Sequence, residues 1–143
     1  MISQRAKYAL RALLALAGSA AGEPLMIGEI SRRQAIPKKF LEQILLELKR
    51  AGIVDSRRGR LGGYVLARPP ERITFGEVLR LIDGPLALLP CLSKIAYKRC
   101  VDCSDETTCE LRHVFARVAD TTRAVLDSTS LADAAKLPAG VVA

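Results

Sequence analysis

The chain has 143 residues, of which 50% are hydrophobic and 26% are charged, and its formal net charge at pH 7 is +7. This length suits one ordinary domain with a sizeable core, and the hydrophobic content excludes an intrinsically disordered chain. No apolar run reaches the roughly 18 to 20 residues that span a bilayer, and the N-terminal residues lack the features of a secretory leader. We therefore expect a cytoplasmic protein with no membrane partner, whose thiols stay reduced.

The positive charge is concentrated in the first half of the chain. Residues 1–72 carry 14 Lys and Arg against 6 Asp and Glu, whereas residues 73–143 carry 8 against 9. The basic half is a candidate surface for a polyanion, although an ordinary solvated surface would have the same charge. An enzyme is not expected, because the chain has one histidine, no phosphate-binding glycine loop and no nucleophile with an evident base.

Apolar residues at helical spacing organise the first 52 residues. They predict an amphipathic helix that ends near Gly18 and a short helix around Ile30. A tight turn at residues 34–36 leads into a third helix, which has Pro37 in its first turn and Gly52 just beyond its end. Two helices joined by a short turn indicate a helix-turn-helix. The expected buried stripe of the third helix is Phe40, Leu41, Ile44, Leu45 and Leu48.

A β-hairpin and one more helix follow. Residues 53–57 and 64–67 favour strands, and the glycines between them permit a turn. A hairpin directly after a helix-turn-helix is a wing. Thr74 and Glu77 then have the spacing of a capping box at the start of an apolar helix, which Gly84 ends.

The C-terminal half contains one long helical pattern with an apolar seam. We interpret this pattern as a dimerisation helix, although a stripe that packs within the same chain would look alike. The residues of the seam are Leu111, Phe115, Val118, Thr122 and Val125. The expected regions are a DNA-binding domain (1–84), a cysteine-rich loop (85–109), a dimerisation region (110–136) and a flexible tail (137–143).

Candidate DNA-contacting residues lie on the third helix and on the wing. A recognition helix places its N-terminal residues in the major groove. Here those residues are Lys38, Lys39, Glu42 and Gln43. Gln43 suits adenine, Glu42 suits cytosine, and the two lysines suit phosphate or guanine. The wing adds Arg57, Arg58 and Arg60. Any one of these could be a solvated charge, but together they indicate binding to double-stranded DNA.

Several stretches carry a resemblance to a known family, above all "FLEQIL", "SRRGRLGGYVL" and "YALRALLALA". With them the chain resembles the IscR, NsrR and RirA type of bacterial winged-helix regulators, also called the BadM or Rrf family. The resemblance implies a mainly α fold with a small β-hairpin wing, namely a winged helix-turn-helix plus a long C-terminal dimerisation helix. It also implies a homodimeric transcription regulator, which we expect to be a repressor at a DNA operator.

In this family the stretch "CLSKIAYKRCVDCSDETTC" corresponds to an iron-sulfur ligand loop. Cys103 and Cys109 match the family's second and third cysteines, and Cys91 matches the first with a longer intervening loop. Cys100 is additional and forms a C-x2-C pair with Cys103. The resemblance therefore implies a [2Fe-2S] or [4Fe-4S] cluster that controls DNA affinity in response to iron, redox state or nitric oxide.

Other interpretations of the cysteines stay open. Zinc accepts four thiolates, but structural zinc sites usually pair two close-spaced knuckles, and only Cys100 and Cys103 form one. A metal-free thiol switch is favoured by the basic residues just before Cys100 and opposed by nearby acidic ones. Inert buried cysteines fit poorly with such polar surroundings. His113 is one residue away from the position of the family's histidine ligand, where this chain has Arg112.

Overall fold

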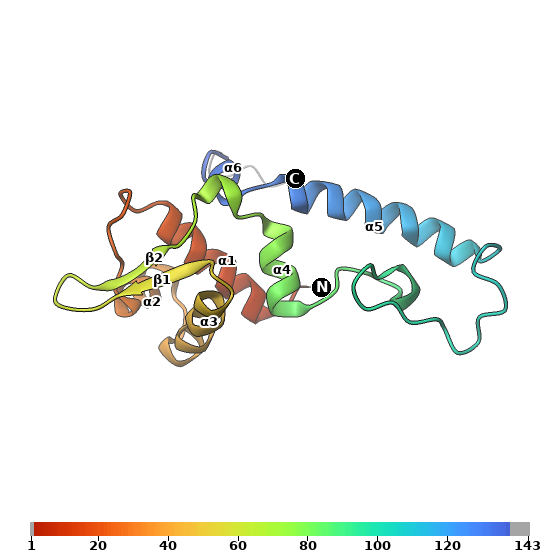
Figure 1. Ribbon diagram of the computed structural model, residues 1–143, viewed down its shortest axis with the longest axis horizontal. Helices are drawn as coiled ribbons and strands as arrows, with labels where there is room; N and C mark the ends of the chain where they lie inside the picture. The colour runs from red at the N-terminus through yellow and green to blue at the C-terminus, as the bar shows by residue number, and fades with distance from the viewer. Residues whose placement is uncertain (1, 138–143) are drawn as a thin grey trace.

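The computed structural model describes residues 2–137 and consists of a compact body and an arm that extends from it (Figure 1). The body contains the N-terminal helices, a two-stranded hairpin and the last helix, whereas the arm contains the longest helix and the loop before it. This is the expected mainly α fold with a hairpin wing. Residues 138–143 of the predicted tail lie outside the described residues. In chain order the elements are α1 (Gln4–Ala17), α2 (Ile27–Gln34), α3 (Lys38–Arg50), β1 (Val54–Arg57), β2 (Gly63–Leu66), η1 (Pro70–Arg72), α4 (Phe75–Asp83), η2 (Pro90–Leu92), α5 (Glu110–Ser128) and α6 (Leu131–Ala135).

Helix α1 is the centre of the body because half of its buried face consists of alanine. These small side chains let α2, α3, α4 and α6 all contact the same helix. The helix begins at Ser3, whose hydroxyl oxygen accepts a hydrogen bond from the Ala6 N–H at 3.0 Å. The buried residues of α1 are Ala6, Ala9, Leu10, Ala12, Leu13 and Leu16.

The turn between α2 and α3 has the tight geometry that the sequence predicts. Ala35 adopts a left-handed backbone conformation, with φ 51° and ψ 47°. Ser31 holds the turn through two hydrogen bonds to Ile36, because its carbonyl accepts from the N–H at 3.1 Å and its hydroxyl donates to the carbonyl at 2.6 Å. The two helices of the helix-turn-helix are therefore held in one arrangement.

Helix α3 buries four of the five residues of its predicted stripe, but not Phe40. Leu41, Ile44, Leu45 and Leu48 have no exposed surface, whereas the Phe40 side chain is 54% exposed. An α-helix turns by about 100° per residue, so Phe40 lies at the edge of the stripe rather than on it. Its prediction as a core residue is wrong for that reason.

The wing is anchored to the body at Gly63. β1 and β2 pair antiparallel, with Arg57 opposite Gly63, and they start and end within one residue of the predicted strands. Gly63 has φ 143°, and a β-carbon there would overlap the carbonyl of Leu25. Leu25 and Tyr64 exchange two backbone hydrogen bonds, at 2.8 and 3.0 Å, which hold the base of the wing against the segment before α2. The tip of the wing projects beyond this anchor.

The capping box predicted for α4 is only half formed. Thr74 accepts a hydrogen bond from the Glu77 N–H at 3.2 Å, as expected. The Glu77 carboxylate, however, pairs with Arg68 at 2.5 Å instead of returning to the Thr74 backbone. The opposite charge of Arg68 explains this choice, since a charged donor forms the stronger hydrogen bond.

The long C-terminal helical pattern is two helices rather than one. α5 ends at Ser128, the chain is extended at Thr129, and α6 begins after Ser130. Ser130 and Asp133 form a complete capping box, with hydrogen bonds of 3.1 and 2.9 Å. Hydrogen bonds from the backbone and side chain of Ser130 lower the pKa of Asp133. A serine that caps a new helix competes with continuation of the old one, which explains the break.

After the break the chain returns to the body. The Phe75 N–H donates to the Thr129 carbonyl at 3.0 Å, and the Leu131 N–H donates to the Ile73 carbonyl at 2.9 Å. Leu131 is fully buried and α6 packs on α1, although the sequence groups it with the dimerisation region. Among residues 2–137, no helix combines the length and the apolar character of a bilayer span.

Candidate DNA interface and cysteine site

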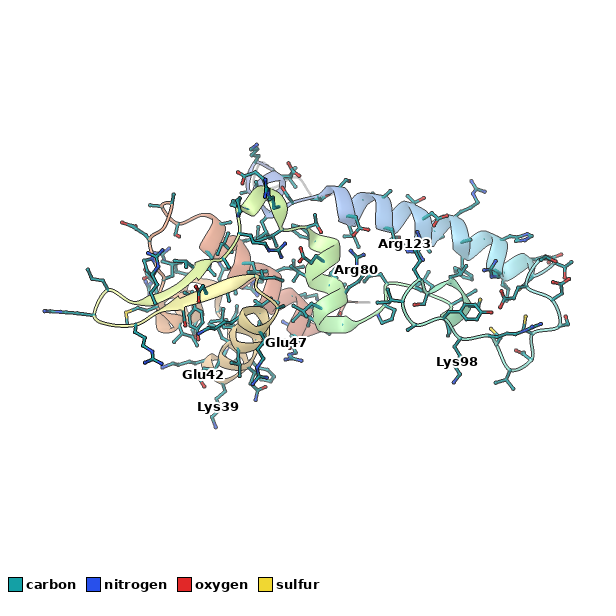
Figure 2. All side chains as sticks on the ribbon, viewed as in Figure 1. Lys39, Glu42, Glu47, Arg80, Lys98 and Arg123 are labelled. Carbon is teal, nitrogen blue, oxygen red and sulfur yellow. The ribbon has the colours of Figure 1, made fainter. Side chains whose placement is uncertain are left out.

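The first two turns of α3 expose the four polar side chains of this helix that the sequence assigns to DNA recognition. Figure 2 shows Lys39 extending from α3 away from the body. Farther along α3, the Lys49 ammonium donates to the Ser56 hydroxyl at 2.5 Å and so ties the helix to β1. Recognition helix and wing are therefore neighbours, as a winged helix requires. The polar residues exposed in these two turns are Lys38, Lys39, Glu42 and Gln43.

The three predicted arginines of the wing differ in their surroundings. Arg57 donates to the Gly22 carbonyl at 3.0 Å and so braces the base of the wing against the loop between α1 and α2. Arg58 and Arg60 lie in the exposed tip, where Gly59 has φ 102°. The geometry therefore makes Arg58 and Arg60 the better placed of the three for contacts with phosphate or the minor groove.

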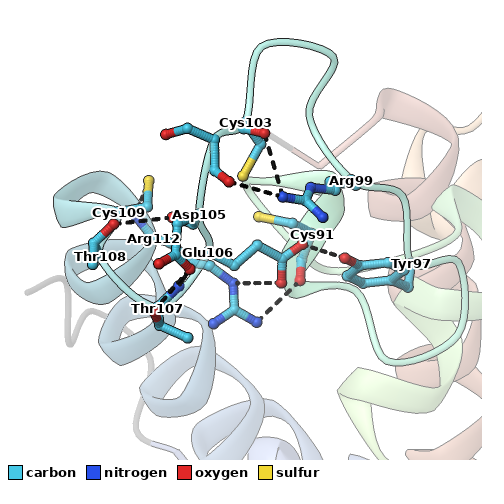
Figure 3. A network of polar contacts seen from close by, with 11 residues as sticks. Cys91, Tyr97, Arg99, Cys103, Asp105, Glu106, Thr107, Thr108, Cys109 and Arg112 are labelled. Atoms are coloured by element: carbon cyan, nitrogen blue, oxygen red, sulfur yellow. Dashed lines mark hydrogen bonds and ion pairs between the residues drawn. The ribbon is translucent and has the colours of Figure 1, made fainter.

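The four cysteines line one hollow of 260 Å³ between the loop and the start of α5. Cys91 lies in η2 and is buried, Cys100 is exposed, and Cys103 and Cys109 are half-buried. Cys109 is also the N-cap of α5, where its sulfur accepts a hydrogen bond from the Arg112 N–H at 3.4 Å. Figure 3 shows three of these cysteines with the polar groups around them. The fold thus places cysteines from both ends of the loop around the same hollow.

Arg112 and Glu106 connect the start of α5 to the loop and to η2. The Arg112 guanidinium lies 3.6 Å from the Glu106 carboxylate and donates to the Cys91 carbonyl at 3.5 Å (Figure 3). Glu106 also accepts a hydrogen bond from the Tyr97 hydroxyl, and this bond raises the pKa of Tyr97. The loop is therefore ordered by polar contacts rather than by an apolar core.

The Arg99 guanidinium, next to Cys100, bonds to the backbone rather than to the thiol. Arg99 donates to the backbone carbonyls of Cys103 and Ser104, at 3.4 and 3.1 Å. Desolvation raises the pKa of Cys100, and the neighbouring Cys91 thiol raises it further.

The donors around the hollow fit an anionic, thiolate-bound metal group. The hollow has four sulfur atoms, and His113 does not line it. The Arg112 Nε is buried without a hydrogen-bond acceptor, since Glu106 lies just beyond hydrogen-bond distance. Among residues 2–137, no three Cys, His, Asp or Glu side chains already converge as metal ligands. The site is therefore not preformed, and the cysteines would have to move closer together to bind such a group.

Helix α5 presents an apolar face that residues 2–137 leave uncovered. Val118 is 42% exposed and lies in a shallow groove with Val114 and Thr122. Val118 and Thr122 belong to the seam that the sequence predicts for a partner helix, and Val114 precedes Val118 by one helical turn. The exposed apolar residues of α5 are Leu111, Val114, Val118 and Val125.

Two arginines connect the cysteine loop, α5 and the body. No motif or spacing in the sequence predicts the contacts of either one. Arg123 donates to the Leu92 carbonyl at 2.7 Å, next to Cys91. Arg80 of α4 pairs with Asp127 of α5 at 2.6 Å, and Figure 2 shows Arg80 and Arg123 between these segments. Such pairings depend on how distant segments meet, so spacing along the chain could not reveal them.

The comparison of the whole chain with families of known proteins agrees with this geometry. A family model described as Rrf2, iron-dependent transcriptional regulator, matches residues 2–136. The chain belongs to the Rrf2 family. An rrf2-like HTH-type transcriptional regulator of Rhodobacter capsulatus is 50% identical over 136 residues, which cover 93% of this chain and 91% of that protein.

Two solved Rrf2-type structures have the same fold. CymR, the global cysteine regulator of B. subtilis, superposes with a TM-score of 0.79 at 30% identity and covers 94% of this chain and 95% of its own. IscR of T. potens superposes with a TM-score of 0.73 at 29% identity, over 98% of this chain and 93% of its own. The Rrf2 relatives are transcriptional regulators and not enzymes, so this chain is a helix-turn-helix regulator of transcription.

Proposed function

We propose that this protein is a dimeric transcriptional repressor of the cytoplasm whose affinity for an operator is controlled by an iron-sulfur cluster. In this proposal residues 1–84 contain the DNA-binding surface, residues 85–109 contribute the loop that holds the cluster, and residues 110–136 contain the dimer contact. The ligands are the thiolates of Cys91, Cys100, Cys103 and Cys109. When bound, the cluster supplies iron-sulfur bonds that respond to iron supply, oxidants or nitric oxide.

The observation that carries the proposal is the single hollow lined by all four cysteines. Thiolates are the ligands that iron-sulfur clusters take, and four of them satisfy either [2Fe-2S] or [4Fe-4S]. The cations of Arg99 and Arg112 beside the hollow offset the negative charge of such a group. The T. potens IscR likeness and the family's description as iron-dependent support the same function.

The residues around the hollow also provide a route to the DNA-binding surface. Arg112 and Arg123 of α5 hold the carbonyls of Cys91 and Leu92 in η2. Asp127 of α5 is in turn paired with Arg80 of α4, which packs on α1 in the body. A change in the position of η2 therefore reaches the body through α5, with a coupling free energy of about 1 to 3 kcal/mol for a typical regulator.

Anaerobic purification and reconstitution with iron and sulfide test the cluster. We expect a brown protein with visible absorbance, and a difference in operator affinity between the apo and reconstituted forms. Cys103→Ser and Cys109→Ser should abolish the absorbance, Cys91→Ser should nearly do so, and Cys100→Ser tests the additional cysteine. Ser104→Ala changes the lining of the same hollow without removing sulfur, so it is the matched control and should keep the cluster.

Three results would contradict the cluster. Zinc without iron or sulfide in the purified protein would indicate a structural zinc site instead. DNA binding that changes only with thiol oxidation would indicate a metal-free switch, in line with the likeness to CymR, which includes a solved oxidised form of the Staphylococcus aureus protein. Equal operator affinity of the apo and reconstituted forms would remove the sensing role altogether.

DNA contacts are tested by comparing one wing residue with one helix residue. Arg58→Ala should weaken binding to all duplexes and lower the salt slope by about 0.9 for each phosphate that the variant no longer neutralises. Gln43→Ala should instead reduce discrimination at one base pair per half-site, by about 1 to 3 kcal/mol. Lys94→Ala removes an exposed cation of the arm and should change neither quantity. Equal affinity for operator and scrambled duplex at physiological salt would refute sequence-specific recognition.

A further inference from the structure

Phe40 is an exposed aromatic side chain among the polar residues proposed to contact DNA. It lies in the first turn of α3, directly after Lys39 and before Glu42 and Gln43. A single exposed apolar side chain needs no explanation by itself. Its place is nevertheless unusual, because the first turn of a recognition helix is the part that enters the major groove.

The helix geometry places the Phe40 ring beside Gln43. Residues three apart on an α-helix are neighbours on the same face, with β-carbons about 5 to 6 Å apart. The buried side of α3 is already filled by its leucine and isoleucine stripe, so the ring lies on the flank between that stripe and the polar face. A groove that receives Gln43 therefore also receives the ring of Phe40.

A contact with α1 orients the ring without burying it. The centroids of Tyr8 and Phe40 are 6.3 Å apart, and their planes are inclined by 60°. On the same flank, Arg5 of α1 pairs with Glu47 of α3, so the two helices are tied together beyond the ring. A ring held in this way loses less side-chain entropy on binding than a free one.

We propose that Phe40 is a specificity-determining residue that contacts the C5-methyl group of a thymine next to the base pair contacted by Gln43. The thymine methyl is the apolar group that the base edges offer in the major groove, and phenylalanine is one of the side chains that pack on it. This inference rests on the proposed recognition of DNA by α3.

The test removes the methyl group and the ring separately and together. An operator is first selected from random duplexes with the dimeric protein, and each of its thymines is then replaced by deoxyuridine, which lacks only the methyl group. Replacement of the critical thymine should weaken binding of the unaltered protein about fourfold per half-site, the value of one buried methyl group. Phe40→Ala should bind the thymine and deoxyuridine duplexes equally, and Phe40→Leu should retain part of the discrimination.

Ile95→Ala is the control, because Ile95 is 68% exposed but belongs to the arm and not to α3. This variant should keep the full thymine preference. The proposal is overturned if every deoxyuridine substitution affects the unaltered protein and Phe40→Ala alike. It is also overturned if Phe40→Ala weakens all duplexes equally, which would indicate packing on the sugar-phosphate backbone. Failure to select any operator is a separate result, since it removes the DNA-binding proposal itself.

Discussion

The body buries 19 hydrophobic residues in one continuous cluster, whereas only three residues are buried in the whole arm segment from 85 to 128. The three are Cys91, Ser93 and Ala119. The body is therefore held by its own core, as expected for an independently stable fold. The arm is held by arginine contacts at a few points and leaves an apolar helix face exposed.

Under the proposed function, a second copy of the chain and a bound group complete the arm. Polar and partly exposed contacts such as Arg80–Asp127 contribute little to stability by themselves, about 0 to 1 kcal/mol each. The arm lacks stabilising buried contacts of its own. A second copy that buries the apolar face of α5, and a bound group that closes the cysteines around it, would supply such contacts. The body should therefore tolerate changes in the arm, and the arm should depend on its partners.

A charge in the apolar face of α5 should have the largest effect. In the proposed dimer, Val118→Glu would bury an unpaired carboxylate between two α5 helices, at a cost of about 3 to 5 kcal/mol. We expect monomers in sedimentation velocity, weaker operator binding, and an unchanged circular dichroism spectrum, because Val118 is 42% exposed in one chain. Ala124→Glu places the same charge on an exposed position about 100° around the helix from Val125 and should leave the dimer intact. A dimeric Val118→Glu protein would show that this face packs elsewhere.

Loss of a leucine should have very different effects in the body and in the arm. Leu13→Ala leaves a cavity in the core at a fully buried position and should lower the free energy of unfolding by about 2 to 5 kcal/mol. Leu111→Ala removes a side chain that is 65% exposed in the single chain, so it should change the stability of the body by less than about 0.5 kcal/mol. Denaturant unfolding measures both, and equal losses would mean that arm and body share one core.

Two glycines offer a smaller, matched test of where the arm meets the body. Gly76 and Gly28 are each the second residue of a helix, but a β-carbon at Gly76 would overlap the Asp127 carboxylate, whereas one at Gly28 meets nothing. Gly76→Ala should displace Asp127 from Arg80 and lower the free energy of unfolding by about 1 kcal/mol. Gly28→Ala should raise it by about 0.4 to 1 kcal/mol. If both variants are equally stabilised in denaturant titrations, Asp127 does not pack tightly against α4.

Much of the body could be predicted from sequence because its signals are local. Helical spacing, Pro37 and Gly52 predict α3, and the hairpin glycines predict the wing. The exposure of Phe40 is not evident from sequence, because an apolar residue at the edge of a stripe looks like part of it. The break before α6 was not predicted from the sequence. Ser130 and Asp133 have the spacing of a capping box, but the apolar helical pattern continues through them and so favours one uninterrupted helix.

The site was predictable only in part, for a related reason. Cysteines and surface cations are visible as residue types, so Cys91 to Cys109 and the arginines of the wing could be named from sequence. The contacts that organise them join residues far apart in the chain, such as Arg123 with Leu92 and Arg80 with Asp127. No pattern along the chain encodes these pairs, because they follow from the way α5 lies against the loop and α4.

Because the chain returns to the body at Thr129, the arm is a long loop-like segment whose two ends both meet α4. The arm leaves the body at the end of α4, and it returns beside the start of the same helix, through backbone bonds of Thr129 and Leu131 to Phe75 and Ile73. A protease that nicks the exposed segment near Arg99 would therefore leave two fragments bound to each other, with α6 still seated on α1. For the same reason the segment between Cys91 and Cys103 can gain or lose residues at little entropic cost, and the loop can change without rebuilding the core of the body.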